Sequence, residues 1–361
     1  MKVTFVIPQD SLAGGIRAVS IYADQLQKRG HDVTVVAGVH APKTYKEKIK
    51  GLLQFRQQQS AASPISSSYF DALDVPLYTL EAHRPVRDSD LPDADVVIAT
   101  WWETAEWIAP LSASKGAKVY FIQHHETFDY LPKGRVEATY RLPFYQITVA
   151  QWLVEILRDR HHSQQVSLVP HGIDLKQFNS LPRLKAAVPT VGLMYATAPW
   201  KGVDIALEAF QYALKDLPAL RLVAFGAEQP SAQLPLPKNT QYYFQPEQAC
   251  LKDIYAQCDA WLFSSRVEGF GLPILEAMAC HTPVIAVPTG AAPDLLSNGC
   301  GILLDRNDPT LIAQAIHDVA TLDTTAWQQL SEHAYQTVCQ RSWEDAAYDF
   351  ETALFEAIAP S

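Results

Sequence analysis

The feature that most constrains this chain is a strand–loop–helix–strand unit at its start, which is repeated in the second half. A short apolar run with β-branched residues, Val3–Ile7, leads into a loop over Ser11–Gly15. A helical pattern follows and stops at Gly30, and Val33–Ala37 is the next strand. Such units predict a parallel sheet covered by helices.

The alternation continues to about residue 170 and restarts after a polar, proline-containing run from His171–Asp174 to Pro189. Further candidate strands in the first half are Asp95–Ala99, Lys118–Ile122, Ile147–Ala150 and Val166–Val169. In the second half they are Thr190–Ala196, Leu220–Phe225, Gln241–Phe244, Ala260–Phe263 and Pro283–Val287, with helices over about 203–216, 248–257, 272–280, 308–321 and 325–340. The fold class is therefore α/β, with two Rossmann-like domains over 1–175 and 186–342 that face each other across a ligand-binding cleft. A last helix, within about 343–361, is expected to pack back toward the first domain.

Composition narrows the class of protein. The 361 residues are 48% hydrophobic and 19% charged, which suits a globular chain of two domains. The net charge is −10, and all of it falls after residue 180, because residues 1–180 hold 19 basic and 19 acidic side chains. An acidic total argues against general nucleic-acid binding, which needs basic surface.

Cysteine content and apolar run lengths predict a cytoplasmic protein. The five cysteines are odd in number, show no CxxC spacing and all lie in the second half. Disulfide frameworks and zinc sites are therefore disfavoured, and a reducing compartment fits best. The N-terminal apolar run is too short for a signal peptide, and no apolar stretch reaches about 18 residues.

The most informative stretch for chemistry is 264–279, where a strand ends and a glycine-punctuated loop leads into a helix. Pro273 stands in the first turn of that helix, a position that tolerates proline. The loop and the free N–H groups of the first turn form an anion-binding concavity, which would include Gly269, Phe270, Gly271 and Leu272. Glu268 and Glu276 flank it, and carboxylates suit sugar recognition because they accept hydrogen bonds from vicinal hydroxyls.

This segment resembles the E-x7-E signature of family-4 glycosyltransferases, which are retaining enzymes of the GT-B fold. The resemblance extends over most of the chain. It includes the Gly14-Gly15 loop, the Arg29–Val33 segment, His171–Asp174, Lys201–Asp204 and the stretch from Ala286 to Gly301 with Thr289-Gly290.

The resemblance implies a role for each matching residue. Glu268 would contact the transferred sugar, and Glu276 would hold the ribose hydroxyls. Lys201 would neutralise the leaving diphosphate, which also agrees with the chemistry, because a fixed cation stabilises charge developing on a phosphate.

The remaining donor-site residues are expected at glycine-rich loops. Gly14 and Gly15 would let the backbone approach a ligand closely. His124, which follows a strand, matches the family's cleft histidine near the reacting sugar. Thr289 and Gly290 are candidates for phosphate or sugar contact.

Three departures from the family pattern stand out. The arginine that usually precedes the lysine by about five residues is Ala196 here, and Arg266 is a candidate replacement. The small residue that the family usually has after Ala-Cys is replaced by His281. The serine often found near residue 150 is replaced by Ala150-Gln151. These changes bear on donor identity and turnover rather than on the fold.

The implied activity is transfer of a sugar from a nucleoside diphosphate to an acceptor hydroxyl, with retention at the anomeric carbon, in glycan or glycolipid synthesis. No metal or cofactor is implied, since no Asp-x-Asp cluster sits in a suitable place. The rival functions are an epimerase or a phosphorylase on the same fold, or a binding subunit without turnover. A dehydrogenase is disfavoured, because no G-x-G-x-x-G follows the first strand.

Several of these residues also have a purely structural interpretation. Glu268 and Glu276 could be solvated charges at a helix end, Lys201 a surface lysine, and Gly14-Gly15 a tight turn. His125 rivals His124, and either could be an interior histidine.

The acceptor, a sugar, a lipid-linked sugar or a small molecule, is expected to bind the first half. The stretch 43–56 carries five basic residues against Glu47, with apolar residues interleaved, and the polar segment 57–68 after it is expected to be a mobile loop. The stretch is either a solvated helix face or a peripheral contact with the inner face of a membrane.

Overall fold

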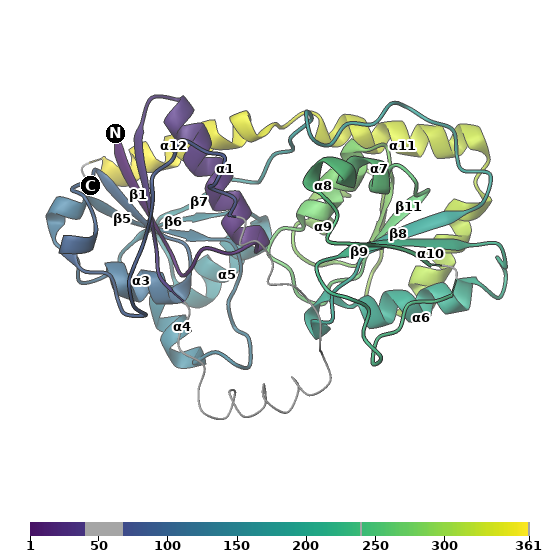
Figure 1. Ribbon diagram of the computed structural model, residues 1–361, viewed down its shortest axis with the longest axis horizontal. Helices are drawn as coiled ribbons and strands as arrows, with labels where there is room; N and C mark the ends of the chain where they lie inside the picture. Colours follow the sequence, from purple (N-terminus) through teal and green to yellow (C-terminus); the bar gives the residue numbers. More distant parts are fainter. Residues whose placement is uncertain (40–67, 239, 360–361) are drawn as a thin grey trace. The chain divides into compact units, whose positions relative to one another are not determined.

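The computed structural model describes residues 1–39, 68–238 and 240–359, which form two compact α/β units (Figure 1). The first unit takes the described residues of Met1–Thr148, Ile156–Ser167 and Ala347–Ser361, and the second takes those of Val149–Glu155 and Leu168–Ala346. Each unit contains one sheet, and every strand pairing described in either sheet is parallel. The expected α/β class with two Rossmann-like halves is confirmed.

The first sheet has the order β3-β2-β1-β4-β5-β6-β7, the doubly wound arrangement in which strand order reverses beside β1. Its strands are β1 (Lys2–Ile7), β2 (Asp32–Ala37), β3 (Leu77–Thr79), β4 (Val96–Ala99), β5 (Ala117–Ile122), β6 (Tyr145–Thr148) and β7 (Val166–Leu168). The helices that carry residues of this unit are α1 (Gly14–Lys28), α3 (Trp102–Ile108), α4 (Lys133–Thr139), α5 (Gln151–His161) and α12 (Trp343–Ile358).

Alternating side chains of the first sheet build two apolar layers, as the two-residue period of a strand requires. On one face, Phe121 of β5 meets Tyr22 of α1 and Phe350 of α12, with ring centroids 5.4 and 5.1 Å away. On the other face, Tyr120 of β5 packs into a cluster with Trp102 of α3 and residues of α4. Figure 1 shows α1 and α12 on one side of the strands and α3 and α4 on the other.

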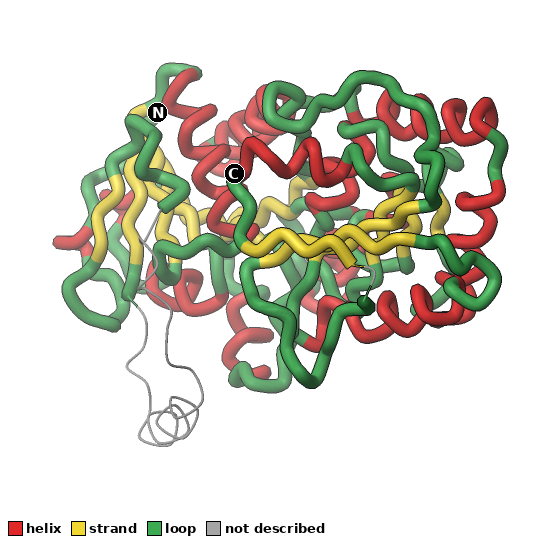
Figure 2. Tube along the Cα trace, turned by 45° about the vertical axis from the view of Figure 1, so that its right-hand side comes forward, coloured by secondary structure: helices red, strands yellow, loops and turns green. Residues whose placement is uncertain are grey.

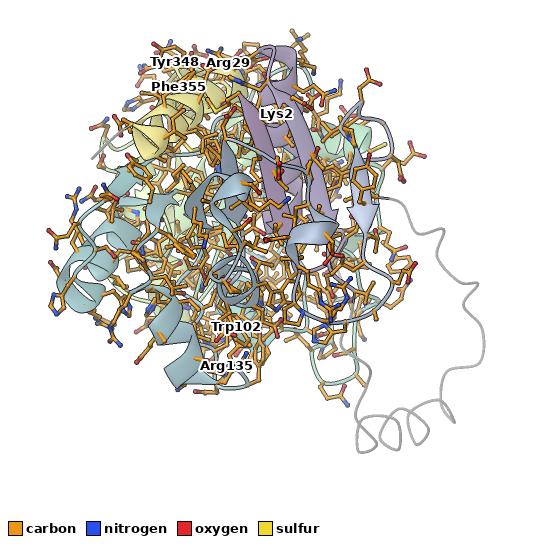
Figure 3. All side chains as sticks on the ribbon, turned by 90° about the vertical axis from the view of Figure 1, so that its left-hand side faces the viewer. Lys2, Arg29, Trp102, Arg135, Tyr348 and Phe355 are labelled. Atoms are coloured by element: carbon orange, nitrogen blue, oxygen red, sulfur yellow. The ribbon has the colours of Figure 1, made fainter. Side chains whose placement is uncertain are left out.

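Helix α12 begins within the second unit and joins the first unit from Ala347 onward. There Glu351 accepts a hydrogen bond from Arg29 Nε at 3.0 Å and lies 2.5 Å from His31 Nε2. The Arg29 guanidinium also lies 5.3 Å from the ring centroid of Tyr348, and Figure 3 shows both residues close to Phe355. Polar and aromatic contacts therefore hold the end of the chain on this unit.

The second sheet repeats the first topology, with the order β10-β9-β8-β11-β12-β13. Its strands are β8 (Thr190–Met194), β9 (Arg221–Gly226), β10 (Thr240–Phe244), β11 (Ala260–Phe263), β12 (Val284–Ala286) and β13 (Ile302–Leu303). Its helices are α6 (Val203–Ala213), α7 (Leu251–Tyr255), α8 (Leu272–Ala279), α9 (Ala292–Leu295), α10 (Pro309–Thr321) and α11 (Thr324–Val338). Helices lie on both sides of these strands in Figure 2.

Several elements differ from the sequence expectation. Helix α1 already begins at Gly14, so the glycine pair opens the helix instead of closing the loop. Helices α3, α4 and α5 and the strands β3 and β13 were not anticipated; α3, α4 and the two strands have seven residues or fewer, whereas α5 has 11. The stretch 43–56 and, except for Ser68, the segment 57–68 lie outside the described residues.

Candidate functional site

The glycine-rich loop between β11 and α8 is shaped by two glycines and a tryptophan. Gly271 caps α8 with φ of +105°, and a Cβ atom there would lie 2.9 Å from the ring of Phe263. Both facts require glycine at this position. The indole N–H of Trp152, on the first turn of α5, donates to the carbonyl of Gly269 at 2.9 Å. Loop conformation is thus fixed on both sides of Phe270.

Glu268 of this loop forms an ion pair with Lys201, which stands before α6 and is far away in sequence. Lys201 Nζ lies 2.7 Å from Glu268 Oε2, and the hydroxyl of Ser265 donates to the same oxygen at 3.2 Å. The two side chains are 24% and 18% exposed, so both charges can be reached from solvent yet are partly desolvated. Attraction between charges is stronger in such a place than in water.

The position of Lys201 follows from the start of α6. Gly202 caps that helix with φ of +62°, and a Cβ atom there would lie 1.9 Å from the carbonyl oxygen of Ser264. The hydroxyl of Ser264 in turn donates to the Gly202 carbonyl at 2.9 Å. The lysine therefore stands on a turn that is packed tightly against the end of β11.

Glu276 is more deeply placed than Glu268. It lies on α8 with only 5% of its surface exposed, and the buried hydroxyl of Tyr255 donates to its Oε2 at 2.8 Å. A buried carboxylate held this way has a fixed orientation, which suits recognition of hydroxyl groups. The two carboxylates thus have different surroundings: Glu268 lies in a loop beside a cation, and Glu276 is a buried residue on α8.

Arg266 forms a bidentate ion pair with Asp204 of α6. Its two terminal nitrogens lie 2.8 and 2.6 Å from the two carboxylate oxygens, and one of them also donates to the carbonyl of Pro199. This hydrogen-bonded pairing raises the pKa of Arg266 and lowers the pKa of Asp204. The guanidinium is therefore already neutralised by a neighbour.

The backbone beside Ala196, where the family's arginine is missing, is held by an acidic partner. The N–H of Thr197 donates to Glu228 Oε2 at 3.2 Å, and the threonine hydroxyl donates to the same oxygen. No cation takes the place of the arginine in these contacts.

Thr289 and Gly290 pack against the backbone of the loop between β11 and α8. The hydroxyl of Thr289 donates to the carbonyl of Ser265 at 2.8 Å. Gly290 has φ of +60°, and a Cβ atom there would lie 2.6 Å from the carbonyl oxygen of Phe270. Both residues thus stabilise the conformation of the loop that carries Glu268.

The candidate residues of the first unit follow the carboxyl ends of β1 and β5. Gly14 and Gly15 form the start of α1, whose cap residue Ala13 offers no side-chain hydrogen bond, and a Cβ atom at Gly14 would meet no atom within 4 Å. Gln123 Nε2 donates to the carbonyl of Gly15 at 3.1 Å and so joins the two loops. The first-turn N–H groups of such a helix can bind an anion.

His124 and His125 have different surroundings. His124 Nδ1 lies 2.8 Å from the carbonyl of His125, which fixes Nδ1 as the protonated nitrogen, and its ring stacks on Phe128. His125 packs against Tyr140, and its Nε2 lies 3.3 Å from Nε2 of His161. Burial, followed by the charge of His161, lowers the pKa of His125 to about 4.

The sequence did not indicate four residues that contact the candidate site residues: Gln123, Trp152, Tyr255 and Ser265. Each lies far along the chain from its partner or carries no motif, and only the Gly-rich loop around 264–271 hinted at Ser265. A buried acid, Glu126, was missed as well: it accepts a hydrogen bond from the N–H of Trp102 at 2.9 Å, and burial raises its pKa well above the usual range.

Two features are absent from the part of the chain that the structure describes. No group of three or more His, Cys, Asp or Glu side chains is arranged to hold a metal ion. Among the same residues, no helix has the length and apolar character needed to cross a bilayer.

Two family models match the chain, one in each half. The model described as Glycosyltransferase Family 4 matches residues 14–177, and the model described as Glycosyl transferases group 1 matches residues 185–337. These are the two regions that contain the candidate residues described above.

Curated relatives match part of the chain. A D-inositol 3-phosphate glycosyltransferase from Geodermatophilus obscurus is 32% identical over 219 residues, which cover 54% of this chain and 49% of the relative. An O-antigen chain mannosyltransferase B from Escherichia coli is 32% identical over 93 residues, 26% of this chain and 24% of the relative. The chain spans between about a quarter and somewhat more than half of the length of these curated relatives, from 24% to 57%.

Solved structures match the whole chain in fold. Sucrose-phosphate synthase from Thermosynechococcus elongatus has a TM-score of 0.75 at 17% identity, with 100% of both chains covered. The Anabaena protein HepE, solved with UDP and glucose, has a TM-score of 0.73 at 17% identity, with 99% of this chain and 100% of that one covered. At such identity the likeness establishes the fold.

Proposed function

Because the chain belongs to the family-4 glycosyltransferases, we propose that it moves a sugar from a nucleoside-diphosphate sugar to an acceptor hydroxyl, in glycan or glycolipid synthesis. The observation that carries the proposal is the Lys201–Glu268 pair beside the glycine-rich start of α8. This arrangement offers a cation, an oriented carboxylate and the amino end of a helix at one place. A diphosphate and a sugar need those three groups.

In the proposed reaction the donor diphosphate binds Lys201 and thereby breaks its ion pair with Glu268. The lysine then neutralises the charge that develops on the leaving phosphate, and Glu268, released from the ion pair, accepts hydrogen bonds from sugar hydroxyls. Glu276 holds the ribose, and His124 lies near the transferred sugar. Gly14 and Gly15 admit the ligand close to the backbone of α1.

The chemical step proposed is retaining. The bond between the anomeric carbon and the phosphate oxygen breaks, and a bond from the same carbon to the acceptor oxygen forms on the same face. The acceptor proton passes to the departing phosphate oxygen, so no enzymic nucleophile is needed. Lys201 and the helix dipole of α8 supply the positive charge, and we therefore propose a metal-independent reaction.

The acceptor is proposed to bind the first unit, and the location is proposed to be cytoplasmic, with a peripheral contact at the inner face of a membrane. Relatives named as glycosyltransferases of an inositol phosphate and of a phosphatidylinositol monomannoside support an anionic or lipid-linked acceptor. The basic stretch 43–56 supports the same choice by its charge.

A release assay tests the proposal. Nucleoside diphosphate release would be measured with UDP-glucose and GDP-mannose, with and without inositol phosphate and phosphatidylinositol acceptors, and in the presence of a chelator. Acceptor-dependent release that resists the chelator, and a product of unchanged anomeric configuration by NMR, are expected. Release with inversion, or loss of release on chelation, would contradict the mechanism.

One alternative has an observation of its own. The expected arginine is Ala196, and Arg266 is paired with Asp204, so the donor site has one fewer cation than the family pattern implies. A binding subunit without turnover would therefore bind the nucleotide sugar but release no nucleoside diphosphate with any acceptor. The same assay, combined with calorimetry of donor binding, separates the two.

A further inference from the structure

The first unit contains a polar pocket away from the candidate residues for sugar transfer. Its volume is about 250 Å³, which is small beside the pockets that bind drug-sized ligands. It is lined by the loop between α4 and β6 (140–144), by Gln146, and by the loop between α5 and β7 (161–165). These loops lead into β6 and β7, so the pocket lies at the amino ends of those strands, whereas Gly14 and His124 follow the carboxyl ends of β1 and β5.

The lining of this pocket carries the positive charge of Arg141, while burial lowers the pKa of His161. Arg141, His161 and His162 contribute to the lining together with glutamine and serine side chains, and none of the described lining residues is a carboxylate. Glu137 of α4 acts on His161 to raise its pKa, and this effect is opposed by Arg141, Arg160 and His162. A small anion would therefore be attracted here.

Two buried polar atoms in the lining have no hydrogen-bond partner. They are Nδ1 of His161 and Oε1 of Gln146, on side chains that are only 6% and 1% exposed. The other ends of both side chains are fixed, because His161 Nε2 lies 3.3 Å from His125 Nε2 and Gln146 Nε2 donates to the carbonyl of Tyr140 at 2.7 Å. A buried polar atom without a partner calls for an explanation, and a bound ion or water molecule is one such explanation.

We propose that this pocket binds a phosphate group, with Arg141 as the main cation and the imidazole of His161 as a second donor. Arginine suits this role because its planar guanidinium can bind two phosphate oxygens at once. A hydroxyl next to the phosphate on the ligand would supply the donor that Gln146 Oε1 needs. The phosphate can belong to a free phosphorylated metabolite or to a lipid headgroup.

Calorimetric titration with inorganic phosphate tests the site directly. Arg141→Gln should raise the dissociation constant about tenfold, the loss expected for one charge-assisted contact. The matched control is Arg158→Gln, which removes the same charge from an exposed position on the last turn of α5 that does not line the pocket. The control should change the constant less than about twofold. The imidazole resonances of His161 should shift on titration in the wild-type protein.

Lys201→Ala separates this site from the proposed donor site, and it should leave phosphate binding at Arg141 unchanged. If Lys201→Ala removes phosphate binding and Arg141→Gln does not, or if His161 resonances never move, the proposal is wrong. Because no sugar donor is used, failure of the proposed transferase activity would not affect this result.

Vesicles distinguish the two sources of the phosphate. Flotation with phosphatidic acid but not with phosphatidylcholine, weakened in Arg141→Gln and unchanged in Arg158→Gln, indicates a lipid headgroup. Phosphate binding in solution that Arg141→Gln weakens, without Arg141-dependent flotation, indicates a free phosphorylated metabolite. Both outcomes support the site and assign its ligand.

Discussion

At the scale of single residues, the ion pair between Lys201 and Glu268 makes the sharpest prediction. Lys201→Ala should lower turnover by roughly 10²–10³-fold, the loss typical of removing one electrostatic stabiliser of a transition state. The fold should survive, because this lysine is not part of the hydrophobic core cluster of the second unit. Steady-state kinetics would be compared with those of Lys238→Ala, which changes an exposed lysine elsewhere in the second unit. Unchanged turnover would show that Lys201 is not at the leaving group.

The two carboxylates should have separable roles. Glu276→Gln should weaken binding of the free nucleoside diphosphate roughly tenfold, since charge-assisted hydrogen bonds to the ribose are lost while the shape of the buried side chain is kept. Glu268→Gln should leave that affinity nearly unchanged and reduce transfer. Calorimetry on both variants, with turnover measured in parallel, checks the assignment. The reverse pattern would exchange the two proposed positions.

At the scale of elements, the first turn of α5 is expected to position the catalytic loop through Trp152. Trp152→Phe keeps the aromatic ring but removes the hydrogen bond to the Gly269 carbonyl, which should raise the KM for the donor and lower kcat several-fold. Trp327→Phe is the matched control, because its indole also donates to a backbone carbonyl at 2.9 Å, that of Asp259, but lies outside the loop.

Trp152→Phe should lose about 1 kcal/mol of unfolding free energy, the usual net value of one hydrogen bond, and Trp327→Phe should lose more, because its fully buried ring also leaves a cavity. The kinetic change is therefore the informative measurement. If the two variants lose activity equally, Trp152 has only a structural role.

Helix α12 should make stability depend on pH. Hydrogen bonding from Arg29, with a further contribution from His31, lowers the pKa of Glu351. A depressed carboxyl pKa stabilises the folded state above its unfolded value and loses that effect as pH falls through the folded pKa. Glu351→Gln should therefore cost about 1 kcal/mol at neutral pH, and the difference should shrink as pH falls below about 4.5.

Denaturant unfolding of the wild type and Glu351→Gln at several pH values would measure this difference. Glu356→Gln, on the same helix, serves as a comparison, because Glu356 is bonded to Tyr145 and Ser167 rather than to a cation. A difference that persists at pH 3 would argue against an electrostatic origin.

At the scale of the whole molecule, the uneven charge predicts which half meets an anionic surface. The first 180 residues are neutral in sum, but residues 43–56 hold a net +4 within them. Near an anionic membrane each basic residue contributes about 1 kcal/mol. Flotation with anionic vesicles at low salt is expected, and it should be lost at high salt or when Lys43, Lys46, Lys48 and Lys50 are neutralised together. Equal flotation with neutral vesicles, or none at low salt, would contradict the membrane contact.

The sequence by itself determined the fold class and the local conformation of the glycine-rich loop before α8. The Val3–Ile7 and Ala260–Phe263 runs are continuous and apolar because both faces of a parallel strand are covered, and this pattern is readable without a partner. The loop from Glu268 to Glu276 is equally local, since its glycines and Pro273 specify its own turn and helix start. Short elements such as β3 and β13 could not be predicted from the sequence, because two or three residues are too few to show an alternating apolar pattern. They become strands only by pairing at the edge of a sheet.

Only the tertiary structure decided which groups meet across the sequence. Three contacts each join residues more than 60 positions apart. They are the Lys201–Glu268 ion pair, the hydrogen bond from Trp152 to Gly269 and the ion pair of Arg266 with Asp204. The Lys201–Glu268 and Arg266–Asp204 partners come together because the parallel strands β8 and β11 place their carboxyl ends, and the loops that follow them, at one edge of the second sheet. The order of the strands sets that edge, and no local pattern encodes which loop will face which.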